Sequence, residues 1–191
     1  MRSQLDRHLS KMVVAIACLA MAAQTAAAQS KSGSMFTTGY TDIGPTVGIG
    51  GLNGASASFG GRFEHAIKPL PDLANGMLGI QVAAEYYSWN YAAGPYSWSV
   101  KNIPIGVTAN YHFKLDEPKL DPFIGAGLGY NLYSCSYGGP SVGSLNCNYS
   151  SGIYFIGRAG ARWFFSPTMA AYGDVGAGGA ALNLGLMFKL H

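Results

Sequence analysis

Apolar residues alternate with small or polar residues along much of this chain. The clearest run is at the C-terminal end, where Leu182, Leu184, Leu186, Phe188 and Leu190 occupy every second position. Successive side chains of a β-strand point to opposite faces, so a period of two predicts a strand whose two faces meet different surroundings.

The same period recurs upstream of this run. It predicts strands within residues 56–64, 78–87, 103–113, 123–133 and 153–163, and weaker patterns predict two more within 46–52 and 169–175. With the C-terminal run, the sequence predicts an all-β fold of eight strands.

The predicted connections fall into two alternating classes. Residues 68–76, 114–121 and 166–168 carry Pro or charge and are expected to form turns, whereas 91–98 and 134–149 are rich in Tyr, Ser and Gly and are expected to form the longer loops. Asn53-Gly54 is typical of a tight hairpin turn. Short turns at one end and longer loops at the other are typical of an up-and-down transmembrane β-barrel.

The residues that alternate with the apolar ones distinguish the predicted membrane barrel from a soluble lipocalin-like barrel. A soluble barrel would present Lys, Glu, Thr and Ser to water, whereas here Gly, Ser, Ala and Asn dominate, which fits the narrow interior of an eight-stranded barrel. A few charged residues share this face and predict an internal ion-pair network: Arg62, Glu64, Glu85, Arg158, Arg162, Asp174 and Lys189. A network of both signs would keep buried charges paired.

Aromatic residues cluster near the predicted strand ends. They predict two girdles at the membrane interfaces. One would include Tyr86, Tyr87, Trp89, Tyr91, Tyr96, Trp98, Tyr130, Tyr133, Tyr137 and Tyr154, and the other Phe63, Tyr111, Phe113, Phe123, Trp163, Phe165 and Phe188.

The N-terminus has the three parts of a secretory signal. Basic residues precede an apolar run, and Ala26-Ala27-Ala28 offers a cleavage site. We expect residues 1–28 to be removed after Ala28, 29–44 to lead into the first strand, and 45–191 to form the barrel. Acylation of Cys18 is the alternative.

Composition narrows the function classes. Hydrophobic residues make up 49% of the chain and charged residues 11%, and no basic cluster indicates nucleic acid as a partner. After cleavage Cys135 and Cys147 would remain in an exported protein, and a disulfide is the expected state of such a pair.

Three stretches resemble the small outer-membrane barrel superfamily, which includes the transmembrane domain of outer-membrane protein A and outer-membrane proteins X and W. They are residues 122–130, PFIGAGLGY; residues 160–167, GARWFFSP; and the final strand. The resemblance implies an outer-membrane location, contact with outer-membrane lipid and insertion by the barrel assembly machinery. Its assembly signal maps to Asn183, Gly185, Phe188 and Leu190, although the chain ends on His191 where relatives usually end on an aromatic.

The sequence offers little catalytic chemistry. A lipid A deacylase of this barrel size would show a His-x-Ser pair on a strand, and the only such triplet is His8-Leu9-Ser10, inside the signal. The Gly-rich run 176–181 lacks the following helix and strand of a dinucleotide site. We therefore predict no catalytic residue, no metal and no cofactor, and we expect His112 to make an interior hydrogen bond near the inner rim.

The main functional hypothesis is a non-enzymatic barrel, plugged by its own side chains, with a structural, barrier or surface-interaction role. A surface protein or glycan could bind through the loop at 134–149. The alternatives are a narrow pore or hydrophobic-solute conduit, a lipid-modifying enzyme, and a soluble periplasmic binding protein.

Overall fold

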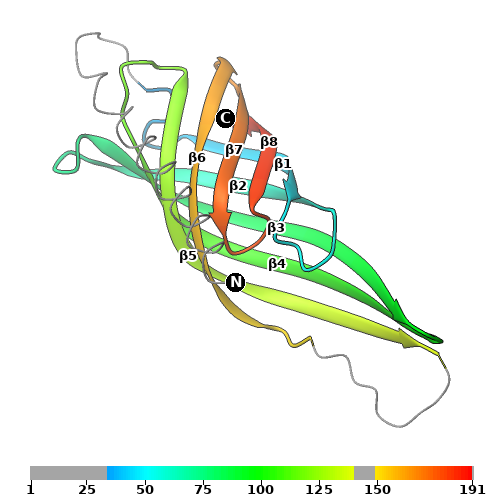
Figure 1. The fold of residues 1–191 in the computed structure, drawn as a ribbon. Coiled ribbons are helices and arrows are strands. Elements are labelled where there is room, and N and C mark those ends of the chain that lie inside the picture. Colours follow the sequence, from blue (N-terminus) through cyan, green and yellow to red (C-terminus); the bar gives the residue numbers. More distant parts are fainter. Residues whose placement is uncertain (1–33, 140–148, 191) are drawn as a thin grey trace, which may run out of the picture.

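The fold is a closed barrel of antiparallel strands, seen in a computed structural model that describes residues 34–139 and 149–190. The strands are β1 (Thr41–Ile49), β2 (Ala57–Leu70), β3 (Gly76–Ala93), β4 (Tyr96–His112), β5 (Leu120–Gly138), β6 (Gly152–Ser166), β7 (Met169–Ala177) and β8 (Leu182–Lys189). Each strand pairs with its neighbour in sequence, and β8 closes the barrel on β1 (Figure 1). The predicted eight-stranded antiparallel barrel is confirmed. Within the described residues, no helix is long and apolar enough to span a membrane.

Side chains alternate along each strand, so that apolar ones form the outer face of the barrel and small or polar ones form its inner face. On β4 and β5 the outward side chains Ile105, Val107 and Leu128 are 42%, 48% and 52% exposed. Their inward neighbours are small or polar, as with Thr108 and Gly127. Gly185 shows why small residues are needed, because a Cβ there would lie 2.6 Å from the carbonyl oxygen of Pro45 on β1.

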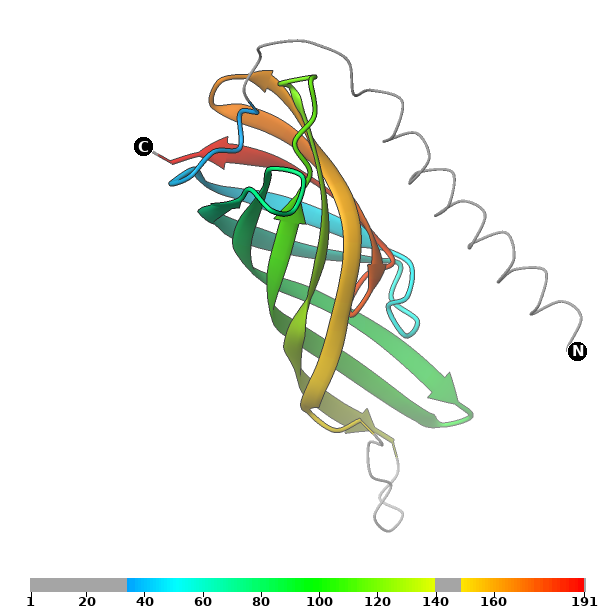
Figure 2. The same cartoon turned by 90° about the vertical axis from the view of Figure 1, so that its left-hand side faces the viewer.

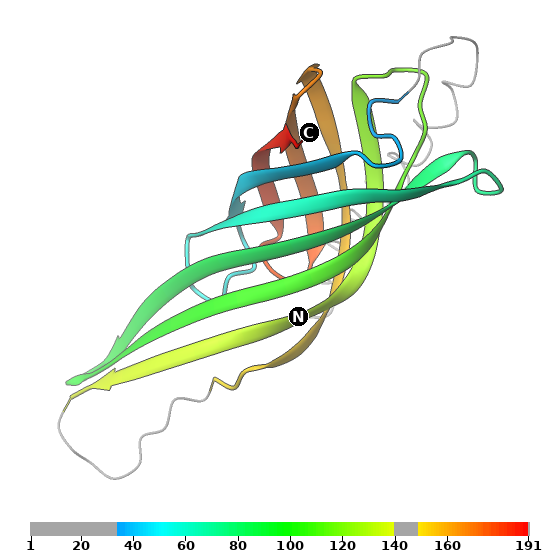
Figure 3. The same ribbon diagram turned by 180° about the vertical axis from the view of Figure 1, so that it is seen from behind.

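The barrel wall is much higher on one side than on the other. Strands β1 and β7 have 9 residues and β8 has 8, whereas β3, β4 and β5 have 18, 17 and 19. A tilted membrane strand needs about 9–11 residues, so β1 and β7 are just long enough to span and β8 is one residue shorter. The long strands continue past this short wall (Figures 2 and 3). We call the end that holds both Thr41 and Lys189 the terminal end, and the opposite end the far end.

The long strands change character where they pass the short wall. Up to Tyr86, Ile103 and Leu132 their outward side chains are mostly apolar, but beyond these residues the exposed outward positions are polar, starting with Ser88 on β3 and Lys101 on β4. We call the parts of β3, β4 and β5 beyond Tyr86, Ile103 and Leu132 the projecting sheet. A polar outer face indicates that the projecting sheet stands in water rather than in hydrocarbon.

Several of the predicted boundaries were wrong. The predicted loop 134–149 begins later, since β5 stays paired with β4 to Gly138. Residues 91–98 are not a long loop, since β3 and β4 stay paired to Ala93 and Tyr96 around a turn at Gly94 and Pro95. The rings of Tyr91 and Trp98 stack across these strands at 4.9 Å, and such cross-strand aromatic pairs favour continued pairing.

The first strand also begins earlier than predicted, at Thr41 rather than near residue 46. Gly44 and Pro45 break the visible pattern, but Pro45 still pairs with Gly61 on β2. The ladder to β8 skips these two positions, as expected where proline has no N–H to donate. Asn53-Gly54 does form a tight turn, with φ angles of 52° and 112°.

Candidate functional site

Arg162 lies at the centre of the barrel interior and is 1% exposed. Its guanidinium contacts carboxylates from three other strands. Nε lies 3.1 Å from Asp42 on β1, Nη1 lies 3.1 Å from Asp121 on β5, and Nη2 pairs with Glu64 on β2. Because β6 carries Arg162, one side chain links four strands across the lumen.

A second group of ion pairs lies beside the first. Asp174 on β7 forms an ion pair with Arg62, whose Nη1 lies 2.8 Å from Oδ2, and also pairs with Arg158. The amide of Asn183 donates to the same carboxylate at 3.1 Å. The ring of Tyr172 lies between the two groups, 4.5 Å from the guanidinium carbon of Arg62 and 5.8 Å from that of Arg162.

His112 completes the first group. Its Nε2 lies 2.8 Å from Glu64 and its Nδ1 lies 3.0 Å from Asp121, so both ring nitrogens face carboxylate oxygens. A neutral imidazole donates from only one nitrogen, whereas the imidazolium donates from both. The imidazolium form therefore fits this position.

We call these residues the ion cluster: Asp42, Arg62, Glu64, His112, Asp121, Arg158, Arg162 and Asp174. Three arginines and one imidazolium face four carboxylates, so the formal charges sum to zero. Charge balance and multiple hydrogen bonds are what allow buried ions to persist at low dielectric.

The terminal end of the barrel is filled by aromatic and apolar side chains. Phe36 comes from the segment before β1, is 1% exposed, and stacks on His112 with ring centroids 3.8 Å apart. The guanidinium carbon of Arg162 lies 4.9 Å from the same ring. We call this group the terminal plug: Phe36, Tyr40, Ala66, Phe123, Phe164, Ala170 and Met187.

A second apolar group fills the far end. Trp89 on β3 is 7% exposed and packs with Tyr87 at 5.9 Å and Tyr149 at 5.2 Å. Leu52 and Ala180 enter from the connections between short strands. We call Leu52, Tyr87, Trp89, Val100 and Ala180 the far plug.

A polar cavity lies between the ion cluster and the far plug. Glu85, Gln81, Tyr154 and Arg158 line it. Arg158 donates to the carbonyl oxygen of Ala180 at 2.7 Å. A second, mostly apolar cavity at the terminal end is lined by Phe36, Met77 and His112.

Among the predicted network residues, the structure brings together Arg62, Glu64, Arg158, Arg162 and Asp174. Glu85 also faces inward, but it accepts a hydrogen bond from Ser58 at 2.9 Å instead of pairing with an arginine in the described part of the chain. Lys189 does not join them; it is exposed at the terminal rim, with Nζ 5.6 Å from the ring of Tyr40.

Sequence reasoning missed Asp42, Asp121 and Tyr172. Asp42 lies before the predicted start of the first strand, and Asp121 was assigned to a charged turn. The alternation does extend to both, since Asp42 and Gly44 share one face and Asp121 and Phe123 share another. Extending each pattern by a few residues would have identified them.

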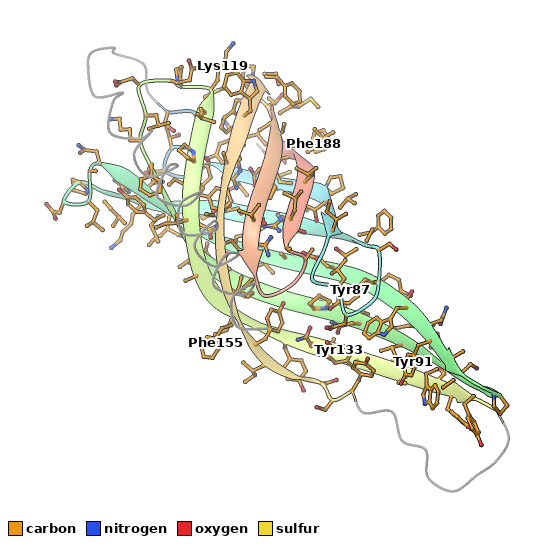
Figure 4. The ribbon with its side chains drawn as sticks, in the orientation of Figure 1. Tyr87, Tyr91, Lys119, Tyr133, Phe155 and Phe188 are labelled. Atoms are coloured by element: carbon orange, nitrogen blue, oxygen red, sulfur yellow. The ribbon has the colours of Figure 1, made fainter. Side chains whose placement is uncertain are left out.

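The predicted aromatic girdles need correction. Tyr87, Trp89 and Phe123 are 5%, 7% and 2% exposed and point into the barrel, where they build the plugs. Other members do lie on the outer face, including Tyr86, Tyr130 and Trp163, which are 43%, 44% and 49% exposed. Figure 4 shows Tyr87 and Tyr133 along the long strands, with Lys119 and Phe188 near the opposite end.

The residues of the predicted assembly signal lie on or just after β8. Asn183 is buried and bonded to Asp174, and Gly185 faces inward. Phe188 and Leu190 are 39% and 42% exposed. The inward face of β5 carries Cys135, which packs against the far plug. Cys147 and the signal-peptide residues lie outside the described residues, so the disulfide and the cleavage remain predictions.

The chemistry of the interior is that of paired charges. Across residues 34–139 and 149–190, no group of three or more His, Cys, Asp or Glu side chains could hold a metal ion. No protein-family model matches the chain, and no curated protein matches its sequence.

Solved structures do match. The outer membrane protein OprG from Pseudomonas aeruginosa aligns with a TM-score of 0.55 and 10% identity, over 83% of this chain and 99% of that chain. The chain has the fold of the small outer-membrane β-barrels. The N-terminal β-barrel domain of Pseudomonas aeruginosa OprF aligns with a TM-score of 0.45 and 17% identity, over 83% of this chain and 100% of that chain. The match to OprG, together with the closed eight-stranded sheet, confirms for the fold the small-barrel resemblance drawn from the sequence.

Proposed function

We propose that this chain is a non-enzymatic outer-membrane barrel whose interior is closed to solutes and whose projecting sheet acts at the cell surface. The observation that carries the proposal is the order of groups along the barrel axis. The terminal plug, the ion cluster and the far plug follow one another, and each contains side chains buried by its neighbours. Eight strands enclose a lumen that side chains just fill.

The outer-membrane location rests on the outward apolar face and on the length of the short strands. Apolar outward positions are interrupted by few polar ones between Ile43 and Ile49 on β1 and between Ile124 and Leu132 on β5. The whole of β1 has 9 residues, which matches the roughly 9–11 residues of a tilted membrane strand. The apolar stretch of β5 matches it too. Exposed apolar area on this scale needs lipid around it. Export through a signal cleaved after Ala28 and insertion by the barrel assembly machinery belong to the same proposal.

A surface role is supported by the projecting sheet. It carries Tyr, Trp, Ser and Asn on rigid paired strands, a composition that suits contact with a protein or a glycan. A pore is the competing function, favoured by the polar cavity beside Arg62, Glu85 and Arg158. The ion cluster and the terminal plug lie between this cavity and the terminal end, which argues against conduction.

Two measurements test the proposal. An outer-membrane fraction run on a gel with and without boiling should show a heat-dependent shift of the protein, because a closed barrel resists detergent until heated. An unshifted band in the periplasmic fraction would overturn the membrane location. Purified protein in planar bilayers should show no stable openings; steady conductance that disappears on Arg158→Gln would establish a pore instead.

A further inference from the structure

Lys101 has an unusual position on the surface of the barrel. Lys101 is exposed on the outward face of β4. It lies two positions beyond Ile103, where the apolar face ends. The register places it directly between Ser88 on β3 and Ser134 on β5. The next outward row is Asn90, Ser99 and Ser136. Lys101 thus stands in the first polar row beyond the hydrocarbon-facing surface.

Lys101 is also the only charged residue that the described strands expose on the outer surface of the far end. Apart from it, the sequences 50–56, 86–104, 132–157 and 175–182 contain no Asp, Glu, Lys or Arg. The other surface charges of the described chain gather at the terminal end: Lys68, Asp72, Lys114, Asp116, Glu117, Lys119 and Lys189. No carboxylate of the described residues lies within ion-pair distance of Lys101. Its ammonium group therefore has no counter-ion from this part of the protein.

We propose that Lys101, flanked by the hydroxyls of Ser88 and Ser134, binds a phosphate group of lipid A in the outer leaflet. The inference rests on the proposed function, because it takes the far end to face outward from the outer membrane. At the level where the apolar face ends, lipid headgroups surround the barrel, and their phosphates are the nearest anions. An ammonium group and two hydroxyls supply charge-assisted and neutral hydrogen bonds to phosphate oxygens.

The position explains why a single cation is placed there. The outward face below Lys101 contacts acyl chains through Ile103, Ile105 and Val107, which are 41%, 42% and 48% exposed. A lipid whose chains lie against these residues would have its headgroup beside Lys101. One molecule would then contact the apolar face and the polar row together.

The test uses the full mature protein in detergent, titrated with lipid A and observed by native mass spectrometry. Lys101→Gln should weaken lipid A binding about fivefold, the size expected for one lysine near an anionic lipid surface. Lys101→Arg should retain most of the binding. Lys119→Gln removes the same charge from the exposed terminal end and is the matched control, which should bind like the unaltered protein.

Lipid A without its phosphates should bind the unaltered protein as weakly as lipid A binds Lys101→Gln. Equal binding by Lys101→Gln and the unaltered protein would overturn the inference, and so would equal binding of phosphorylated and phosphate-free lipid A. Competition by phosphatidylglycerol at equal concentration would overturn the assignment to lipid A. Each sample is also checked for the heat-dependent gel shift, because its absence would overturn the membrane location and the lipid site together, whereas its presence isolates the lipid site.

Discussion

Arg162 shows how one residue organises the barrel interior. Its side chain is buried, and its partners Asp42, Glu64 and Asp121 come from three other strands. Removing a charge from such a cluster leaves its partners buried without compensation, which costs more than the pair contributes when intact.

Arg162→Gln should therefore destabilise the barrel by about 3–5 kcal/mol, since three carboxylates lose their shared cation. Urea unfolding in lipid vesicles, followed by the loss of the unboiled gel band, measures the change. Lys119→Gln is the control and should change stability by less than about 0.5 kcal/mol, as expected for an exposed residue. A loss for Arg162→Gln no larger than the control would contradict the central role of this guanidinium.

His112 permits a spectroscopic prediction. Because Glu64 and Asp121 accept from its two nitrogens at 2.8 Å and 3.0 Å, both nitrogens should carry protons at neutral pH. Nitrogen-15 NMR of histidine-labelled protein distinguishes the imidazolium from either neutral tautomer. The half-buried His65 gives an internal comparison, since among the described residues only its Nδ1 has a hydrogen-bond partner, the hydroxyl of Thr41 at 2.6 Å. A neutral-imidazole spectrum for His112 would show that a carboxylate carries the proton instead.

At the scale of elements, the long strands β3, β4 and β5 each belong to two parts of the molecule. The part of β3, β4 and β5 beside the short wall completes the barrel. The projecting sheet continues past the last pairings of β3 with β2 and of β5 with β6. The pairings of β2 with β3 stop at Phe59 and Tyr86, while β3 and β4 remain paired to Ala93 and Tyr96. The tip of this hairpin therefore contributes no contact to the short wall.

Replacing residues 90–99 by Asn-Gly should leave the barrel stable. The change removes the tip but keeps Trp89 and Val100, which belong to the far plug, and Asn-Gly forms the two-residue turn that closes a hairpin. We expect the heat-dependent gel shift to remain and its transition temperature to move by only a few degrees. Loss of the shift would show that the hairpin tip is needed for the barrel to fold.

The alternation along the chain was enough to predict the strands, which side chains face inward and most of the ion cluster, because every strand of a membrane barrel alternates in the same way. The prediction failed where alternation does not decide a residue's place. Phe36 plugs the barrel from a segment with no period of two, so only tertiary packing reveals its place. Trp89 belongs to an aromatic group, and composition alone did not separate an inward plug from an outward girdle. Glu85 and Lys189 both occupy inward-facing positions of their strands. Whether either lies near an arginine depends on its position along the barrel axis, which the alternation does not give.

For the whole molecule, the proposed closure of the lumen would be redundant. The terminal plug and the far plug lie on either side of the ion cluster, so that no single group closes the lumen alone. A solute would have to displace all three.

Phe36→Ala and Trp89→Ala should therefore leave the barrel non-conducting in planar bilayers, although each loses about 3–5 kcal/mol of stability from a buried aromatic side chain. The outward Phe155, which is 83% exposed, provides a matched control, and Phe155→Ala should cost far less. Steady current through either plug variant would show that this plug is the only barrier.

The uneven distribution of charge bears on how the barrel enters the membrane. Insertion from the periplasm requires the far end to cross the hydrocarbon, and a lysine held at the bilayer midplane costs roughly 2–4 kcal/mol. In the orientation that the proposed function takes, only Lys101 would incur that cost, since the remaining surface charges of residues 34–139 and 149–190 lie at the terminal end and would stay on the periplasmic side. The molecule is thus built with a leading end that is nearly free of ions and a trailing end that holds its charges in water, an asymmetry that makes insertion in one direction far easier than in the other.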